Sequence, residues 1–222
     1  MLLEKIDYDK IPELAKKMKS CFAYNININK NAYLNWCVSK GEDVGTQFWC
    51  LAEGYFESAI SLIDICLKDN LDKKADIYIF PILFNIVQGT ELYLKAIIDY
   101  LYIILKEQHK LVGGHNIKQL SQEAMSRFIE FKQKEDNTEV EECITALQLV
   151  QNFIDNIYDK TDDMAFARYP IDSKKQEMFY TATHENVVVD LEILREQSIY
   201  VFSMLDFIID TILRYMEYLS YS

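Results

Sequence analysis

The chain has 222 residues, and 50% of them are hydrophobic, which is enough for one domain with a sizeable buried core. Its 35 acidic and 23 basic residues give a formal net charge of −12, which repels phosphate backbones and excludes general binding to duplex DNA. A local basic pocket, or a basic partner protein, remains compatible with that charge. Because only 6 glycines and 3 prolines are available for tight turns, the composition predicts an all-α fold of long helices.

The five cysteines are odd in number, and none belongs to a Cys-x-x-Cys pair or has a histidine at metal-ligand spacing. We therefore expect reduced core residues in a cytoplasmic protein, with no metal site and no cofactor. The first residues, MLLEKIDYDK, carry charges where a secretory signal would have a continuous apolar stretch. Secretion is not indicated.

The first 45 residues are predicted to form a short helix, about residues 9–20, followed by an irregular arm rich in asparagine. A helical bundle domain of residues 46–222 is expected to follow. Its first helix is indicated by apolar residues at three- and four-residue spacing, with Asp43 or Thr46 able to cap the first amides. These apolar residues are Phe48, Leu51, Tyr55, Ala59, Leu62 and Cys66.

The most apolar stretch predicts a second long helix from about residue 74 to residue 108. Polar residues, among them Glu91, Lys95 and Asp99, interrupt it too often for a transmembrane span, which needs about 20 consecutive apolar residues. We expect a buried central helix and no membrane insertion.

The remaining segments continue the helical pattern. A third helix carries an apolar stripe between residues 117 and 131, and a fourth covers about residues 138–158. After a loop, the stretch MFYTATHENVVVD alternates on either side of His184, which predicts a small β-hairpin. A last long helix covers about residues 190–219. The sequence therefore predicts an all-α, up-and-down helical bundle with a small hairpin before the last helix.

Two narrow polar ribbons run along the second and the last of these helices when successive residues are advanced by 100°. The first ribbon consists of Gln88, Glu91, Lys95, Asp99, Tyr102 and Lys106, and the second of Arg195, Ser203, Asp206, Asp210, Arg214 and Glu217. If the ribbons faced each other they would form a polar cleft inside the bundle, and if they faced outward they would be solvated edges. Because charged side chains are rarely buried, the solvated arrangement is favoured.

Three segments carry a family resemblance. GTELYLKAIIDYL contains a helical Glu followed by Lys-Ala, GHNIKQL follows a helix that ends in glycine, and FARYPID precedes a long terminal helix. In this order they resemble the HEPN superfamily, whose helical bundles are common in prokaryotic toxin–antitoxin and phage-defence systems. The resemblance spans residues 89–219 and implies a HEPN-like bundle, with the helix from Thr46 supplying the remaining element.

One departure from the family pattern concerns catalysis. Ribonuclease members of the superfamily carry an Arg, four to six further residues and then a His, and no arginine of this chain has a His at that distance. Lys110 precedes His115 by five positions, but a lysine in an interhelix loop is interpreted as a coincidence. The resemblance therefore implies the fold without its standard ribonuclease site.

His115 and Asn116 follow two glycines at the start of a helix, where backbone amides attract anions and where either residue can simply cap the helix. Capping is the favoured interpretation. In the functional alternative, His115 acts as a general acid/base or a phosphate donor beside Lys95.

Arg168 and Tyr169 lie in a loop that Pro170 stiffens. A structural ion pair between Arg168 and a carboxylate such as Glu91 is the favoured interpretation. If Arg168 instead joined Glu91, Lys95 and His115 in one pocket, its planar guanidinium would help to hold a nucleotide or an RNA phosphate.

From these features we expect a HEPN-like module of a bacterial defence or toxin–antitoxin system, which binds RNA, a nucleotide or a partner protein without the standard ribonuclease site. Its ligand-binding residues would be Glu91, Lys95, Asn116 and Tyr169. The alternative is a divergent metal-independent endoribonuclease whose catalytic residues are His115 and Arg168. A homodimer through the long helices is also expected, because their narrow polar ribbons leave more apolar surface than one bundle can bury.

Overall fold

The structure is a computed structural model that describes residues 8–34, 43–107, 114–135, 138–161, 164–172 and 174–221. The chain divides into two compact units, residues 1–36 and 37–222. The first unit contains the short helix α1 (Ile11–Lys17) between two 3-10 turns, Tyr8–Lys10 and Ile28–Lys30. In the loop of this unit, asparagine side chains accept hydrogen bonds from backbone N–H groups, and Asn31 Oδ1 accepts from Asn25 N at 2.8 Å. No described side chain of this unit is buried.

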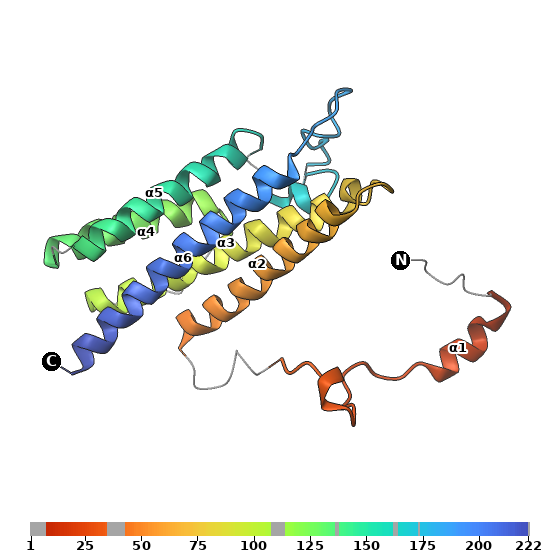
Figure 1. The fold of residues 1–222 in the computed structure, drawn as a ribbon, viewed down its shortest axis with the longest axis horizontal. Helices are drawn as coiled ribbons and strands as arrows, with labels where there is room; N and C mark the ends of the chain where they lie inside the picture. The colour runs from red at the N-terminus through yellow and green to blue at the C-terminus, as the bar shows by residue number, and fades with distance from the viewer. Residues whose placement is uncertain are drawn as a thin grey trace. The chain divides into compact units, whose positions relative to one another are not determined.

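The second unit is built from long helices, which are drawn in orange to blue in Figure 1. They are α2 (Val44–Lys68), α3 (Ala75–Leu105), α4 (Ile117–Lys134), α5 (Thr138–Tyr158) and α6 (Leu191–Ser220), with the 3-10 turn η3 (Met164–Ala167) between the last two. Within the described residues there is no β-strand. The predicted all-α helical bundle is confirmed.

The helix boundaries follow from side-chain caps and one left-handed residue. Asp43 caps α2, because its carboxylate accepts from the Thr46 backbone N–H at 2.7 Å and from the Thr46 hydroxyl at 2.8 Å. In the turn between α2 and α3, Asn70 Oδ1 accepts from the backbone N–H of Ala75, the first residue of α3, at 3.0 Å. Lys106 ends α3 in the left-handed conformation, with φ of 55°.

The connection from α3 to α4 sets the direction of α4. His115, which precedes α4, contacts Glu91 in the middle of α3, whereas Lys134 at the end of α4 lies 3.4 Å from the carbonyl oxygen of Leu105, the last residue of α3. α4 therefore begins beside the middle of α3 and ends beside the C-terminal end of α3, and the two helices run in the same direction (Figure 1). This arrangement places His115 beside the polar ribbon of α3.

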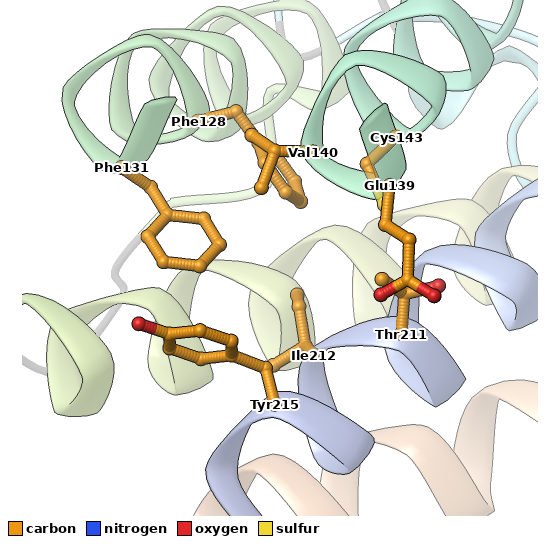
Figure 2. A pocket seen from close by; sticks show the side chains of 8 residues that line it. All are labelled: Phe128, Phe131, Glu139, Val140, Cys143, Thr211, Ile212 and Tyr215. Atoms are coloured by element: carbon orange, nitrogen blue, oxygen red, sulfur yellow. The ribbon is translucent and has the colours of Figure 1, made fainter. Parts of the chain in front are cut away.

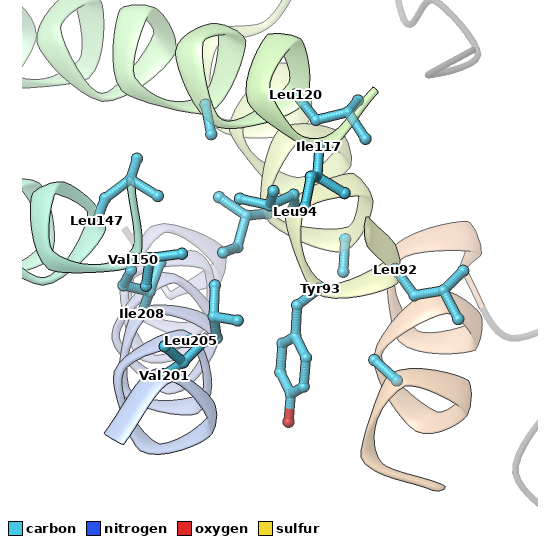
Figure 3. Close-up of a cluster of buried hydrophobic side chains, with 14 of the residues drawn as sticks. Leu92, Tyr93, Leu94, Ile117, Leu120, Leu147, Val150, Val201, Leu205 and Ile208 are labelled. Atoms are coloured by element: carbon cyan, nitrogen blue, oxygen red, sulfur yellow. The ribbon is translucent and has the colours of Figure 1, made fainter. Parts of the chain in front are cut away.

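α3 is the central helix of the bundle and packs against α2, α4 and α6. Every residue from Gly89 to Tyr102 is buried, and Figure 3 shows Leu92, Tyr93 and Leu94 pointing toward different neighbouring helices. Glycine lets α2 approach closely, since a Cβ on Gly89 would lie 2.6 Å from the Phe56 ring. By length and composition alone α3 could cross a membrane, and half of its most apolar window is buried in this structure.

The predicted β-hairpin around His184 is wrong. The region contains one isolated antiparallel bridge, between Ile171 and Glu177, and then turns in which Met178 O accepts from Thr181 N at 2.8 Å. Met178 is buried with Phe166 whereas the segment's valines, at residues 187–189, are all exposed, so the stretch does not alternate between buried and exposed positions as a strand would. His184 is exposed in a turn.

The two polar ribbons have different surroundings. The expectation that both face water is wrong for α3, where Glu91, Lys95, Asp99 and Tyr102 are all buried. On α6, Ser203, Asp210, Arg214 and Glu217 are exposed, and Arg195 and Asp206 are half-buried, so this ribbon is a solvated edge. The two ribbons do not form a common cleft.

Candidate functional site

The middle of the α3 ribbon holds a buried ion pair with a histidine above it. Lys95 Nζ lies 2.8 Å from Glu91 Oε1, and the two side chains are only 9% and 5% exposed. The same carboxylate oxygen lies 2.9 Å from His115 Nδ1, although the His115 side chain is 85% exposed. Helix periodicity places Lys95 one turn after Glu91, and the return of the chain before α4 supplies His115.

This geometry fixes the orientation of the imidazole. A carboxylate without its proton can only accept hydrogen bonds, so Nδ1 of His115 is the nitrogen that donates to Glu91. In the neutral ring the lone pair is then on Nε2, on the part of the ring that faces solvent. Nε2 can accept a proton or, once protonated, donate to an anion.

The Lys95 ammonium has an aromatic neighbour as well as a carboxylate. Its Nζ lies 5.9 Å from the centre of the Phe48 ring, on the first turn of α2. One ammonium and one carboxylate largely cancel each other, which makes their burial tolerable. The pair therefore holds His115 through the Glu91 carboxylate and contributes little net charge to the surface.

Asn116 acts as the cap of α4, as the favoured interpretation of this segment predicted. Its side-chain oxygen accepts from Gln119 N at 3.0 Å and from the Tyr158 hydroxyl at 2.9 Å. The Tyr158 ring also lies 5.4 Å from the ammonium of Lys118, which pairs with Asp155 at 2.7 Å. The start of α4 thus places the exposed His115 directly before a cap residue that the Tyr158 hydroxyl holds in place.

Arg168 and Tyr169 lie on the same side of α3 as Glu91, but nearer to the N-terminal end of the helix. Both are exposed, and the Arg168 guanidinium lies 5.6 Å from the Phe84 ring centre and 5.5 Å from that of Tyr169. Phe84 is two helical turns before Glu91, a separation of about 10 Å along the axis. In the part of the chain that the structure describes, Arg168 forms no ion pair with Glu91, so the expected Glu91–Arg168 pair is absent.

The structure therefore brings together Glu91, Lys95 and His115, with Asn116 beside them, and leaves Arg168 and Tyr169 apart. Lys110 lies outside the described residues. Sequence reasoning missed Phe48 and Tyr158, because each approaches the site from a helix distant in sequence. The spacing of Phe48 marks it as apolar and helical, but no local pattern places it beside Lys95.

The bundle also contains one very small cavity between α4, α5 and α6. Figure 2 shows the side chains around it, which include Cys143, Thr211 and Tyr215. Its volume of about 10 Å³ is at the lower limit for a single water molecule, so it cannot hold an organic ligand. An open groove of about 350 Å³ lies between α5 and α6, with Leu149 and Met204 in its lining.

The expectation that the cysteines are core residues holds for Cys66 and Cys143, which are buried, whereas Cys50 is half-buried and Cys21 is exposed. Burial raises the pKa of the Cys143 thiol to about 11, so it is an unreactive core side chain. Burial also raises the pKa of Cys66. Among the described residues, no three His, Cys, Asp or Glu side chains gather as a metal site would need.

No protein-family model, curated protein or solved structure is significantly similar to this chain. The HEPN resemblance therefore rests on the three sequence segments quoted above and their order.

Proposed function

We propose that the chain is a HEPN-like module of a bacterial defence or toxin–antitoxin system, which binds the phosphate of an RNA or a nucleotide at the start of α4. The observation that carries this proposal is the exposed His115 ring, whose Nδ1 is held by a buried Glu91–Lys95 pair. A ring fixed in this way presents Nε2 next to the first-turn amides of an 18-residue helix. Helix amides and an imidazole are both donors that suit a phosphate.

The charges around His115 suggest few phosphate contacts. The negative body of the protein opposes a long nucleic-acid footprint, and Lys95 and Lys118 are each paired with a carboxylate. Arg168 is the exposed cation on the same side of α3, about 10 Å along the axis from Glu91. A short single-stranded RNA would reach from His115 to Arg168, whereas a mononucleotide would contact His115 alone.

Binding is tested by the fluorescence anisotropy of a labelled single-stranded RNA of about 20 nucleotides, with ATP as competitor. We expect His115→Ala to weaken RNA binding about tenfold, since it removes a charge-assisted donor. His184→Ala is the matched control, because His184 is also exposed but lies in the loop before α6. Equal binding by both variants would refute the proposed site, and retention of a binding partner only in a pull-down would favour a protein ligand.

The enzymatic alternative, a metal-independent endoribonuclease, has one specific observation in its favour. A histidine that donates from Nδ1 to a carboxylate carries its lone pair on Nε2, as a general base requires. Arg168 would then have to reach the phosphate across the bound RNA, because it does not contact His115 among the described residues.

Cleavage separates the two functions. The protein is incubated with total RNA and tRNA in EDTA, alongside His115→Ala, Arg168→Ala and the His184→Ala control. The binding proposal expects no cleavage by any of the four proteins. Cleavage by the wild type that is lost in His115→Ala and Arg168→Ala, but kept in His184→Ala, would establish the nuclease instead.

The cytoplasmic location and the homodimer stay predictions. For the dimer, the measurement is light scattering or sedimentation equilibrium of the purified full chain across a range of concentrations.

A further inference from the structure

The N-terminal unit carries large apolar side chains that its described residues leave uncovered. Between residues 8 and 34 no described side chain is buried, so these residues form no core of their own. Four of the apolar residues alternate along the stretch FAYNINI and are between 62% and 94% exposed. They are Phe22, Tyr24, Ile26 and Ile28, which we call the apolar knob. Exposed apolar side chains gathered in this way are typical of a segment that binds a partner.

The asparagines of the same stretch hold the loop in shape. Asn25 and Asn31 close it, because Asn31 Oδ1 accepts from Asn25 N at 2.8 Å and Asn31 Nδ2 donates to Asn25 O at 2.9 Å. Within the closed loop, Asn27 N donates to Asn25 Oδ1 and Asn29 N donates to Asn27 Oδ1. The polar groups are therefore used inside the loop while its isoleucines stay exposed. A loop that is ordered before it binds loses less conformational entropy on binding.

A groove of matching chemistry lies on the bundle, between α5 and α6. Its volume of about 350 Å³ is within the range of ligand pockets, roughly 300–1,000 Å³. The apolar side chains of Ala146, Leu149 and Met204 line it, together with Glu141 and Glu142. Leu149 is 47% exposed although it is a large apolar residue within a helix. The groove therefore offers apolar surface beside carboxylates.

The charges of the two surfaces are opposite. Residues 8–34 contain five lysines and two acidic residues, so the rest of the chain carries more than the whole net charge of −12. At the groove, Lys132 pairs with Glu141, whereas Glu142 forms no ion pair with any described residue. An anionic membrane would attract the lysines but repel the acidic bundle, whereas a second copy of the chain attracts them with that same bundle. Charge therefore favours a second copy as the partner.

We propose that the apolar knob of one copy docks in the α5–α6 groove of a second copy. Ile26 and Ile28 contact Leu149 there, and Lys30, which follows the knob, pairs with Glu142. Because each copy carries one knob and one groove, reciprocal docking closes a dimer. This contact differs from the one expected through the apolar sides of the long helices. It does not depend on phosphate binding at His115.

The test measures the self-association of the full chain by sedimentation equilibrium. Ile26→Ser/Ile28→Ser should raise the dimer Kd at least tenfold, because it removes apolar side chains that the groove covers. Leu71→Ser/Val188→Ser is the matched control, since these two side chains are also highly exposed but lie in other loops, and it should change the Kd less than twofold. The knob is exposed in the free chain, so the thermal midpoint of dilute, monomeric protein should stay unchanged in both variants.

A second pair of variants tests the groove. Leu149→Lys should also raise the dimer Kd at least tenfold, because it places a cation where the knob and Lys30 dock. Ile129→Lys adds the same charge at a position on α4 that is exposed to the same extent, 48%, and should change the Kd less than twofold.

Mixing the variants identifies the contact as knob in groove. Ile26→Ser/Ile28→Ser keeps an intact groove, and Leu149→Lys keeps an intact knob. An equimolar mixture of the two should therefore associate through one intact contact, at least threefold more tightly than either variant alone.

Four outcomes would overturn the proposal. One is a wild-type chain that stays monomeric at every soluble concentration. Another is a dimer that survives both the knob and the groove substitutions, which would use a different surface. A mixture that associates no better than its components would mean that knob and groove do not meet. Binding to phosphatidylserine-containing vesicles that is lost in Ile26→Ser/Ile28→Ser, without self-association, would identify a membrane-binding segment instead.

Discussion

The ribbons on α3 and α6 have the same pattern in the sequence and opposite surroundings in the structure. Each is a narrow line of charged and polar residues on a long apolar helix. On α3 the line is covered by the start of α2 and by the segment before α4, and Glu91, Lys95 and Asp99 are buried. On α6 the line runs along the surface, and its arginines pair with exposed carboxylates.

The difference shows what a polar ribbon can and cannot indicate. Its width states how much of a helix is apolar, and both ribbons are narrow. Whether a ribbon is covered depends on the segments that pack beside it, which for α3 include Phe48 of α2 and His115 before α4. A covered ribbon must satisfy its charges internally, and this requirement produces the Glu91–Lys95–His115 arrangement.

The largest expected effect comes from breaking the buried pair. Glu91→Ala leaves the Lys95 ammonium buried without its carboxylate and should destabilise the fold by about 3–5 kcal/mol in urea unfolding. Asp210→Ala breaks the corresponding exposed pair on α6 and should cost less than about 1 kcal/mol. Equal costs for the two variants would contradict the distinction between the ribbons.

A double substitution shows whether the cost comes from the orphaned charge. Glu91→Met/Lys95→Met removes both buried charges and keeps the volume, so it should recover most of the stability that Glu91→Ala loses. A double variant as unstable as Glu91→Ala would mean that the carboxylate holds the fold through His115 or another partner rather than through Lys95.

The next largest effect tests how tightly α3 is enclosed. Gly89→Ala would place a methyl group 2.6 Å from the Phe56 ring and 3.3 Å from the Ala52 carbonyl oxygen, and it should destabilise the protein by about 1–3 kcal/mol. Gly54, on the exposed side of α2, has open space around its Cβ position, so Gly54→Ala should stabilise the protein by about 0.5–1 kcal/mol. Both are measured by urea unfolding, and a stabilising Gly89→Ala would mean that α2 and α3 are loosely packed.

The exposed histidine that contacts the buried pair should matter little for stability. His115 is 85% exposed, and Lys95 remains bonded to Glu91 when the imidazole is removed. His115→Ala should therefore lower the free energy of unfolding by less than about 1 kcal/mol, although we expect it to weaken RNA binding. A loss comparable to that of Glu91→Ala would mean that His115 has a structural role and that its effect on binding is indirect.

Much of the helical architecture follows from the sequence alone. Apolar periodicity gives the long helices, and the Asp43 cap is a local signal that the structure confirms. Contacts between distant segments do not follow, because periodicity does not say which helix is the neighbour. The approach of His115 to Glu91 depends on the direction of α4, and the nearness of Glu53 to Asp206 depends on the α2–α6 register. The false hairpin has a related cause, since alternation in the sequence does not show which side chains are covered, and the valines at residues 187–189 are all exposed.

The smallest expected effect concerns Glu53, a half-buried carboxylate on α2, and depends on pH. The pKa of Glu53 is raised above its ordinary value of 4.5 by burial and by neighbouring carboxylates, so the folded protein binds this proton more tightly than the unfolded chain. The charged form is therefore unfavourable at pH 7, and the cost disappears as the pH falls through the raised pKa.

Glu53→Gln should be more stable than the wild type at pH 7, by less than about 1 kcal/mol because the side chain is partly solvated. In urea unfolding the two proteins should converge near pH 4, whereas Glu217→Gln, on the exposed end of α6, should differ from the wild type by less than about 0.5 kcal/mol at pH 7. A difference for Glu53→Gln that grows on acidification would mean that this carboxylate is stabilised in the folded protein, contrary to the raised pKa.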